Sequence, residues 1–243
     1  MINQSKQNGS ANSPDVKKFF DKEWELYKRV IKLNYMSHKE VLEILRKFFR
    51  SVPSPTFSVL ELGCGDASLL SSALQGTQIG TYCGVDISPH ALELADENIR
   101  LLHSNNRFVE GDLLEEVGKF EAEFDVIVAG YSFHHLMIEE KGQFFKECRA
   151  VLKSRGTLII FDVVCTPGEN RNDYIKRFSR ICMQEWNQLT NEELLRICDH
   201  VKNSDYPETV ETYKQLAEEN GFQRTQKLFH DKHNLYGVFS FTI

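Results

Sequence analysis

Residues 59–67 read Val-Leu-Glu-Leu-Gly-Cys-Gly-Asp-Ala, a short apolar run that carries an acid and ends in a Gly-x-Gly turn. Leu69, Leu70 and Leu74 follow at helical spacing. Gly63 and Gly65 allow the backbone to turn tightly and to approach a ligand with no side chain in the way. The stretch predicts a strand, a turn and a helix that could hold a nucleotide cofactor. Taken alone, it is also typical of an ordinary strand-to-helix turn.

Short apolar runs alternate with longer helical segments along the chain. Such alternation, with nearly continuous apolar strands, is typical of a parallel sheet covered by helices on both faces. The predicted strands are 58–62, 82–86, 107–110, 124–129 and 157–161, with helices after the second strand (opened by Ser88 and Pro89), at 139–152 and at 208–220. Two β-rich runs, 224–229 and 235–242, are joined by a short polar turn and predict a closing antiparallel pair.

The domain organisation follows from composition and periodicity. Residues 1–14 are polar and lack periodicity, so we expect a disordered tail. Residues 15–243 are expected to form a single α/β domain, doubly wound around a mostly parallel sheet. Within it, 15–52 would be an N-terminal helical lid and 165–206 a helical cap insertion, although the second segment could equally be a plain connecting helix pair.

The bulk composition narrows the classes of partner. The chain has 243 residues, a formal net charge of -6 and no dense Lys/Arg tract, which disfavours nucleic acid as a partner. It has neither an apolar run of roughly 20 residues nor a signal-like start, so we expect no membrane association and a cytoplasmic protein. The six cysteines form no C-x-x-C pair and are interpreted as reduced packing residues.

Two further acids stand at predicted strand ends. Asp86 ends the second strand, where a carboxylate can accept both hydroxyl protons of a ribose. Asp112 follows the third strand in a Gly-Asp pair, placed to accept from an adenine amine. Each acid alone is also typical of a helix cap or a solvated turn. Together with Glu61 they place three acids at three successive strand ends beside the glycine turn.

This combination resembles the class I S-adenosylmethionine (SAM)-dependent methyltransferases, which have an acid-x-Gly-x-Gly-x-Gly turn, a ribose-binding acid after strand two and a Gly-Asp pair after strand three. The resemblance runs from about residue 57 to the end of the chain, with Ala67 where the third glycine often stands. It implies a seven-stranded sheet whose last strand is antiparallel, and SAM as cofactor. The implied cofactor contacts are Glu61, Gly63, Cys64, Gly65, Asp86, Ile87, Asp112, Leu113 and Ala129.

Substrate-facing groups are implied after the fourth strand, where residues 129–136 read Ala-Gly-Tyr-Ser-Phe-His-His-Leu. This segment is similar to the His-His-Leu of many small-molecule methyltransferases, and it lacks the Asp/Asn-Pro-Pro-aromatic tetrad of enzymes that methylate adenine or glutamine amides. Tyr131 and His134 are therefore candidate catalytic residues, with His134 orienting the acceptor or acting as a base. A helix cap or a packing role is the alternative for these histidines.

The N-terminal helices and the second helical segment supply the remaining candidates. His38 is a third catalytic candidate, and Tyr27, Tyr35 and Trp186 are candidate substrate contacts, although aromatic stripes are more often core. No metal site is expected, because His134 and His135 are adjacent and should point apart.

The predicted function is transfer of a methyl group from SAM to an oxygen or nitrogen atom of a small molecule, by a monomer or homodimer. A non-catalytic SAM-binding scaffold and an NAD-dependent oxidoreductase are the alternatives. The oxidoreductase alternative lacks support, because the chain has no catalytic pair of the Tyr-x-x-x-Lys type near its later strands.

Overall fold

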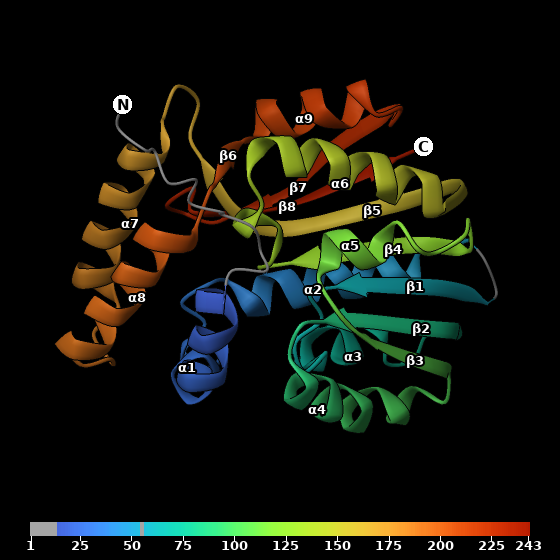
Figure 1. Cartoon of the computed structure of the whole chain (residues 1–243), viewed down its shortest axis with the longest axis horizontal. Helices are drawn as coiled ribbons and strands as arrows, with labels where there is room; N and C mark the ends of the chain where they lie inside the picture. Colours follow the sequence, from blue (N-terminus) through green and yellow to red (C-terminus); the bar gives the residue numbers. More distant parts are fainter. Residues whose placement is uncertain (1–13, 54–55) are drawn as a thin grey trace, which may run out of the picture.

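The computed structural model describes residues 14–53 and 56–243, and the side chains of the first helix from residue 23 onward. The predicted disordered tail, 1–14, lies outside the described residues except for its last position. The described chain folds around one large sheet flanked by helices, with a separate group of helices at one end (Figure 1).

The sheet runs in the order β3-β2-β1-β4-β5-β8-β7, with β6 added beside the end of β5. Strands β1 to β5 pair in parallel, whereas β8 is antiparallel to both β5 and β7. The mostly parallel sheet with a closing antiparallel pair is thus confirmed. The strands are β1 Phe57–Leu62, β2 Ile79–Asp86, β3 Asn105–Glu110, β4 Phe124–Gly130, β5 Leu152–Cys165, β6 Glu208–Thr209, β7 Arg224–His230 and β8 Tyr236–Thr242.

Each face of the sheet has its own buried core, because alternate strand residues point to opposite faces. In β1, Val59 belongs to one apolar cluster and Leu60 to the other. The first cluster is completed from α2, α3 and α4 and from three further helices described below, and the second from α5, α6 and α9. These helices are α2 His38–Arg50, α3 Ser68–Leu74, α4 Pro89–Ile99, α5 Leu113–Val117, α6 Ile138–Val151 and α9 Val210–Glu219, with single 3-10 turns η1 Arg100–Leu102 and η2 Phe133–His135.

Several element boundaries differ from the sequence-based prediction, and those of β5 and α9 show the reason most clearly. The strand expected at 157–161 begins at Leu152, where Phe124 of β4 pairs with it, and ends at Cys165. The helix expected from 208 begins at Val210, because Glu208 and Thr209 pair with Val164 and Cys165. Pairing between distant segments decides both boundaries, and local periodicity does not report it.

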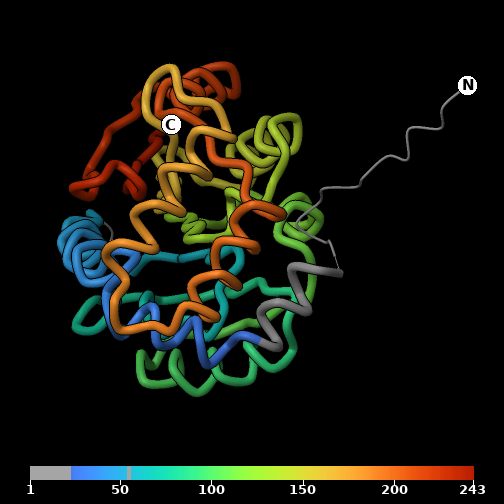
Figure 2. Tube along the Cα trace, turned by 90° about the vertical axis from the view of Figure 1, so that its left-hand side faces the viewer, coloured from blue at the N-terminus to red at the C-terminus, as the bar shows by residue number. Residues whose placement is uncertain are grey.

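Three helices, α1 Pro14–Lys32, α7 Arg171–Glu185 and α8 Asn191–Ser204, lie together at one end of the sheet (Figures 1 and 2). We call them the end helices. Two ion pairs join α1 to α8, Arg29 with Glu193, and Arg196 with Glu23 at 3.0 Å. The segments 15–52 and 165–206, distant in sequence, therefore meet in space. Among the described helices, none is long and apolar enough to cross a membrane.

Candidate active site

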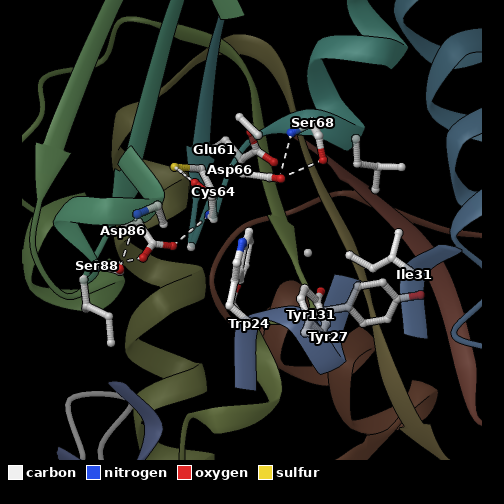
Figure 3. A pocket seen from close by; sticks show the side chains of 18 of the residues that line it. Trp24, Tyr27, Ile31, Glu61, Cys64, Asp66, Ser68, Asp86, Ser88 and Tyr131 are labelled. Carbon is white, nitrogen blue, oxygen red and sulfur yellow. Dashed lines mark hydrogen bonds between the residues drawn. The ribbon is translucent and has the colours of Figure 1, made fainter. Parts of the chain in front are cut away.

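A cavity of about 960 Å³ opens where β1, β2 and β4 end, between those strand ends and α1 (Figure 3). Its volume lies at the upper end of the usual range for small-molecule sites, so it could hold a nucleoside cofactor together with part of a second molecule. Carboxyl ends of parallel strands are where open α/β sheets bind ligands.

The Gly-x-Gly turn after β1 is tied to the end of β2. The backbone N–H groups of Gly63 and Cys64 both donate to the carbonyl oxygen of Val85, at 2.8 and 2.9 Å. Gly63 has a φ of 69°, and a Cβ there would lie 2.5 Å from Cβ of Ser132. Gly65, at a φ of 52°, has no atom within 4 Å of the position where a Cβ would stand. The first glycine is thus required by packing, while the second leaves room at the cavity wall.

Asp86 braces this turn. One carboxylate oxygen accepts from the backbone N–H of Gly65 at 2.8 Å, and the other accepts from that of Ser88 at 2.9 Å. Ser88 in turn caps α4, as predicted. Each carboxylate oxygen can accept more than one hydrogen bond, so Asp86 can serve the turn and still bind a ribose.

Asp112 combines both roles that its position allows. Its Oδ1 caps α5 by accepting from the N–H groups of Leu114 and Glu115, at 2.9 and 3.1 Å. Its Oδ2 is buried at the cavity and accepts no hydrogen bond from any described residue. Leaving a buried acceptor unpaired costs about 1–3 kcal/mol. A ligand amine placed there would remove that cost.

Glu61 is a buried carboxyl group at the cavity wall. Burial raises its pKa to about 8, although the hydrogen bond from the Tyr82 hydroxyl, at 2.5 Å, acts in the opposite direction. A cationic ligand beside Glu61 would favour the ionised form. The site therefore suits a positively charged cofactor.

The predicted cofactor residues line this cavity, with one exception. Ala129 does not line the cavity: its side chain lies in the second apolar cluster, and the neighbouring Gly130 and Tyr131 line the cavity instead. The lining residues that sequence reasoning missed include Trp24, Asp66, Ser68, Ser132 and His135. Asp66 could have been found, since it follows the glycine turn directly and its carboxylate accepts from the Ser68 hydroxyl at 2.7 Å.

Tyr27, His38 and Tyr131 form the opposite side of the cavity. The ring of His38 lies 4.9 Å from that of Tyr131 and 6.4 Å from that of Tyr27. Burial lowers the pKa of His38 to about 4, so its imidazole is neutral at pH 7. Its Nδ1 is buried and has no hydrogen-bond partner among the described residues. Tyr131 is held in place by a hydrogen bond from its hydroxyl to the carbonyl of Met36.

A second, smaller cavity of about 70 Å³ lies beside the first. Tyr27, Tyr131 and His135 line both, so the two cavities meet at these side chains. His134 and Trp186 line only the second cavity. Tyr35 lines neither; its ring stacks on Trp186 with centroids 4.8 Å apart, which joins the α1–α2 turn to the end of α7.

The two histidines after β4 do not point apart, contrary to the sequence-based expectation. Their ring centroids are 4.0 Å apart, because hydrogen bonds anchor both rings toward the same buried region. Nδ1 of His134 lies 2.5 Å from Oδ1 of Asp162, and Nδ1 of His135 lies 3.0 Å from the carbonyl oxygen of Ser204. A ring nitrogen of each, with a carboxylate oxygen of Asp205, lies in a group whose members are within 4.8 Å of one another. Such a group could hold a metal ion.

The pKa values of His134, His135 and Asp205 are all shifted from their usual values. Burial acts to lower the pKa of His134, but the charges of Asp162 and Asp205 and the hydrogen bond to Asp162 together raise it. Burial, followed by the neighbouring His134 and His200, places the pKa of His135 well below its usual value. Burial raises the pKa of Asp205 to about 6.

The antiparallel β8 inserted between β5 and β7, with the glycine turn and the acids at the strand ends, defines a class I methyltransferase fold. A family model described as a methyltransferase domain matches residues 60–158. An uncharacterized methyltransferase of Bacillus velezensis is 31% identical over 168 residues, covering 68% of this chain and 69% of that protein. The phosphoethanolamine N-methyltransferase of Plasmodium falciparum is 27% identical over 206 residues, covering 82% of this chain and 74% of that protein.

A solved structure shares the same architecture. The possible histamine N-methyltransferase of Thermotoga maritima has a TM-score of 0.61 at 16% identity, covering 93% of this chain and 98% of that one. At this identity the likeness concerns the fold alone. The family model and the relatives above show that the chain belongs to the class I SAM-dependent methyltransferases. It is an enzyme that uses SAM as methyl donor.

Proposed function

We propose that this enzyme transfers the methyl group of SAM to an oxygen or nitrogen atom of a small molecule bound where the two cavities meet. The observation that carries this proposal is the sharing of Tyr27, Tyr131 and His135 by the cofactor cavity and the smaller enclosed one. The smaller cavity has room for a few heavy atoms rather than for a polymer. The relative that methylates phosphoethanolamine, by its name, supports the same class of acceptor.

In this proposal SAM occupies the large cavity. Asp86 would accept from the ribose hydroxyls and Oδ2 of Asp112 from the adenine amine, and Glu61 and the Gly63–Gly65 turn would hold the cationic methionine part. Ile87 and Leu113, which also line the cavity, would flank the adenine. The unpaired Oδ2 of Asp112 supports the second of these contacts.

Methyl transfer from a sulfonium requires the acceptor atom, the methyl carbon and the leaving sulfur to lie in line, in a site without water. Near-attack placement alone can lower the barrier by about 7–11 kcal/mol. We assign His38 to this placement, because it is neutral, buried and has an unpaired Nδ1 that can bond an acceptor N–H or O–H. Tyr27 and Tyr131 would hold the acceptor from either side.

The test compares His38→Asn with His103→Asn. His103 is an exposed histidine with a φ of 54°, a conformation that asparagine tolerates well. A donor-labelled methyl-transfer assay over a pool of small amines and hydroxy compounds first identifies an acceptor. We expect His38→Asn to lower kcat/KM for it about tenfold to a hundredfold, with the Kd for SAM within about threefold of wild type.

His103→Asn should match the wild type in both measurements. An equal loss of kcat/KM in the two variants would show that His38 does not contact the acceptor. Methyl transfer to folded protein or RNA, with none to any small molecule, would overturn the proposed acceptor class. Cofactor binding without transfer to any acceptor would favour the scaffold alternative.

A further inference from the structure

The polar cluster beside the smaller cavity is larger than the proposed function requires. Three histidines, His134, His135 and His200, surround one carboxylate oxygen, Oδ1 of Asp205. All four residues line the smaller cavity. Oδ1 of Asp205 is buried and accepts no hydrogen bond from the described residues, and the residue is only 3% exposed.

The distances in the cluster are too long for hydrogen bonds. Oδ1 of Asp205 lies 3.5 Å from Nε2 of His134, whereas hydrogen bonds between such atoms span about 2.7–3.2 Å. Two ligand atoms that each lie about 2.1 Å from a tetrahedral ion are separated by about 3.4 Å. The distance between Nε2 of His134 and Oδ1 of Asp205 is therefore close to that of two donors around one ion. His135 completes a group of three donor atoms that lie within 4.8 Å of one another.

The surroundings orient the donors as in metal sites. Nδ1 of His134 faces Asp162, and Nδ1 of His135 faces the carbonyl of Ser204. A carboxylate or a backbone carbonyl on the second ring nitrogen is the usual partner of a metal-binding histidine, because it fixes the ring and raises its basicity.

The local charge also favours a cation. Lys141, whose side chain is fully buried, pairs with Glu208 at 3.4 Å, donates to the carbonyl of Tyr206 and interacts electrostatically with Asp162 and Asp205. Arg171, partly exposed, donates to backbone carbonyls at the end of α8. Metal binding requires neutral imidazoles, and in that state three carboxylates face two cations.

We infer that His134, His135 and Asp205 bind a divalent first-row transition-metal ion, with a fourth coordination position facing the smaller cavity and His200 beside it. Two imidazoles and one carboxylate are a donor set used for zinc and for non-haem iron. The binding of the ion stands independently of the acceptor. Its contact with the acceptor rests on the proposed function, in which a Lewis acid at this position would polarise an acceptor oxygen or nitrogen.

The test uses the full chain after treatment with a chelator. Calorimetry with Zn²⁺ should show one tight equivalent, and Co²⁺ should give the intense visible absorption of a four-coordinate site. Asp205→Asn and His135→Gln should each weaken Zn²⁺ binding roughly a hundredfold or more. Asp199→Asn, an exposed neighbour of His200 on α8, is the matched control and should bind as the wild type does.

Two outcomes overturn the inference: wild-type Zn²⁺ binding no tighter than that of both variants, or a weak Co²⁺ spectrum typical of a surface site. Circular dichroism verifies that each variant is folded, and the second variant still tests the inference if the first fails to fold. SAM binding and methyl transfer are measured separately. Failure of the metal site with methyl transfer intact is therefore distinguishable from failure of the proposed function.

Discussion

At the scale of single residues, Gly63 and Gly65 in the turn after β1 are required for different reasons. Gly63 is fixed by its contact with Ser132, whereas the side-chain position at Gly65 opens onto the cavity. Sequence reasoning identified both glycines but could not separate these roles, because the contact of Gly63 is with a residue far along the chain.

Gly65→Ala should therefore weaken cofactor binding more than it weakens the fold. The new methyl group would enter the cofactor space, and the left-handed backbone would add about 1–2 kcal/mol of strain. Gly76→Ala is a matched control, since Gly76 has a φ of 76°, open space around it and no place in the cavity lining. We expect similar losses of melting temperature in both, but at least a tenfold rise in the Kd for SAM only in Gly65→Ala. A similar Kd in both would show that the cofactor does not reach Gly65.

Glu61 makes cofactor binding dependent on pH. Its pKa of about 8 in the free protein means that the carboxyl group is mostly protonated at pH 7. A bound cation lowers that pKa, so binding releases a proton, and affinity for SAM should rise with pH up to about 8 and then level off. Calorimetry in buffers of different ionisation enthalpy measures the released proton. Glu61→Gln should abolish both the release and the pH dependence, and their persistence in that variant would assign them to another group.

At the scale of elements, the end helices were only partly predictable. Helical periodicity indicates 172–202 correctly as helical, and the structure divides it into α7 and α8. The contacts of α8 with α1 depend on how the chain turns at residues 186–190. The sequence pattern of either helix alone does not predict these contacts. Tyr35 illustrates the limit: its aromatic character suggested a substrate contact, and the structure shows that its ring stacks on Trp186 and lines neither cavity.

Trp186 should hold this group of helices together. It is 4% exposed, stacks on Tyr35 and meets Phe178 edge to face. Trp186→Ala should lower the free energy of unfolding by about 3–5 kcal/mol, as deletion of a buried tryptophan usually does. Leu195→Ala on α8, where the leucine is 56% exposed, should change it by less than about 0.5 kcal/mol. Urea denaturation measures both free energies of unfolding. Equal changes in the two variants would mean that the stacking of Tyr35 on Trp186 contributes little to stability.

At the scale of the whole molecule, a cofactor in the large cavity would contact segments from distant parts of the chain. The large cavity is bounded by α1, the start of α2 and the ends of three strands. A cofactor analogue at about a hundred times its Kd should add about 2.7 kcal/mol of stability. For a chain of this size that corresponds to a rise in melting temperature of roughly 5–11 °C. Differential scanning fluorimetry with S-adenosylhomocysteine measures it, and NAD should give no shift; the reverse result would revive the oxidoreductase alternative.

The mostly parallel sheet with its closing antiparallel pair was predictable because it follows from repeated local patterns of apolar residues. The group formed by His134, His135, His200 and Asp205 was not predictable. Asp162 directly follows a predicted strand and His134 follows another, but His200 and Asp205 come from the end of α8 and the residue after it. Adjacent histidines gave the opposite expectation, since the anchors that turn them together, Asp162 and Ser204, are distant in sequence.

The placement of β8 has a consequence for how the protein is made. β8 lies between β5 and β7, yet α7, α8, α9 and β7 are all synthesised between β5 and β8. While the ribosome is still producing these segments, the long edge of β5 has no antiparallel neighbour, and β7 has no strand on which to dock. Open strand edges invite pairing with other chains. Nascent chains halted before Tyr236 should therefore be prone to aggregation and dependent on chaperones, even though every residue that lines the cofactor cavity has already been made.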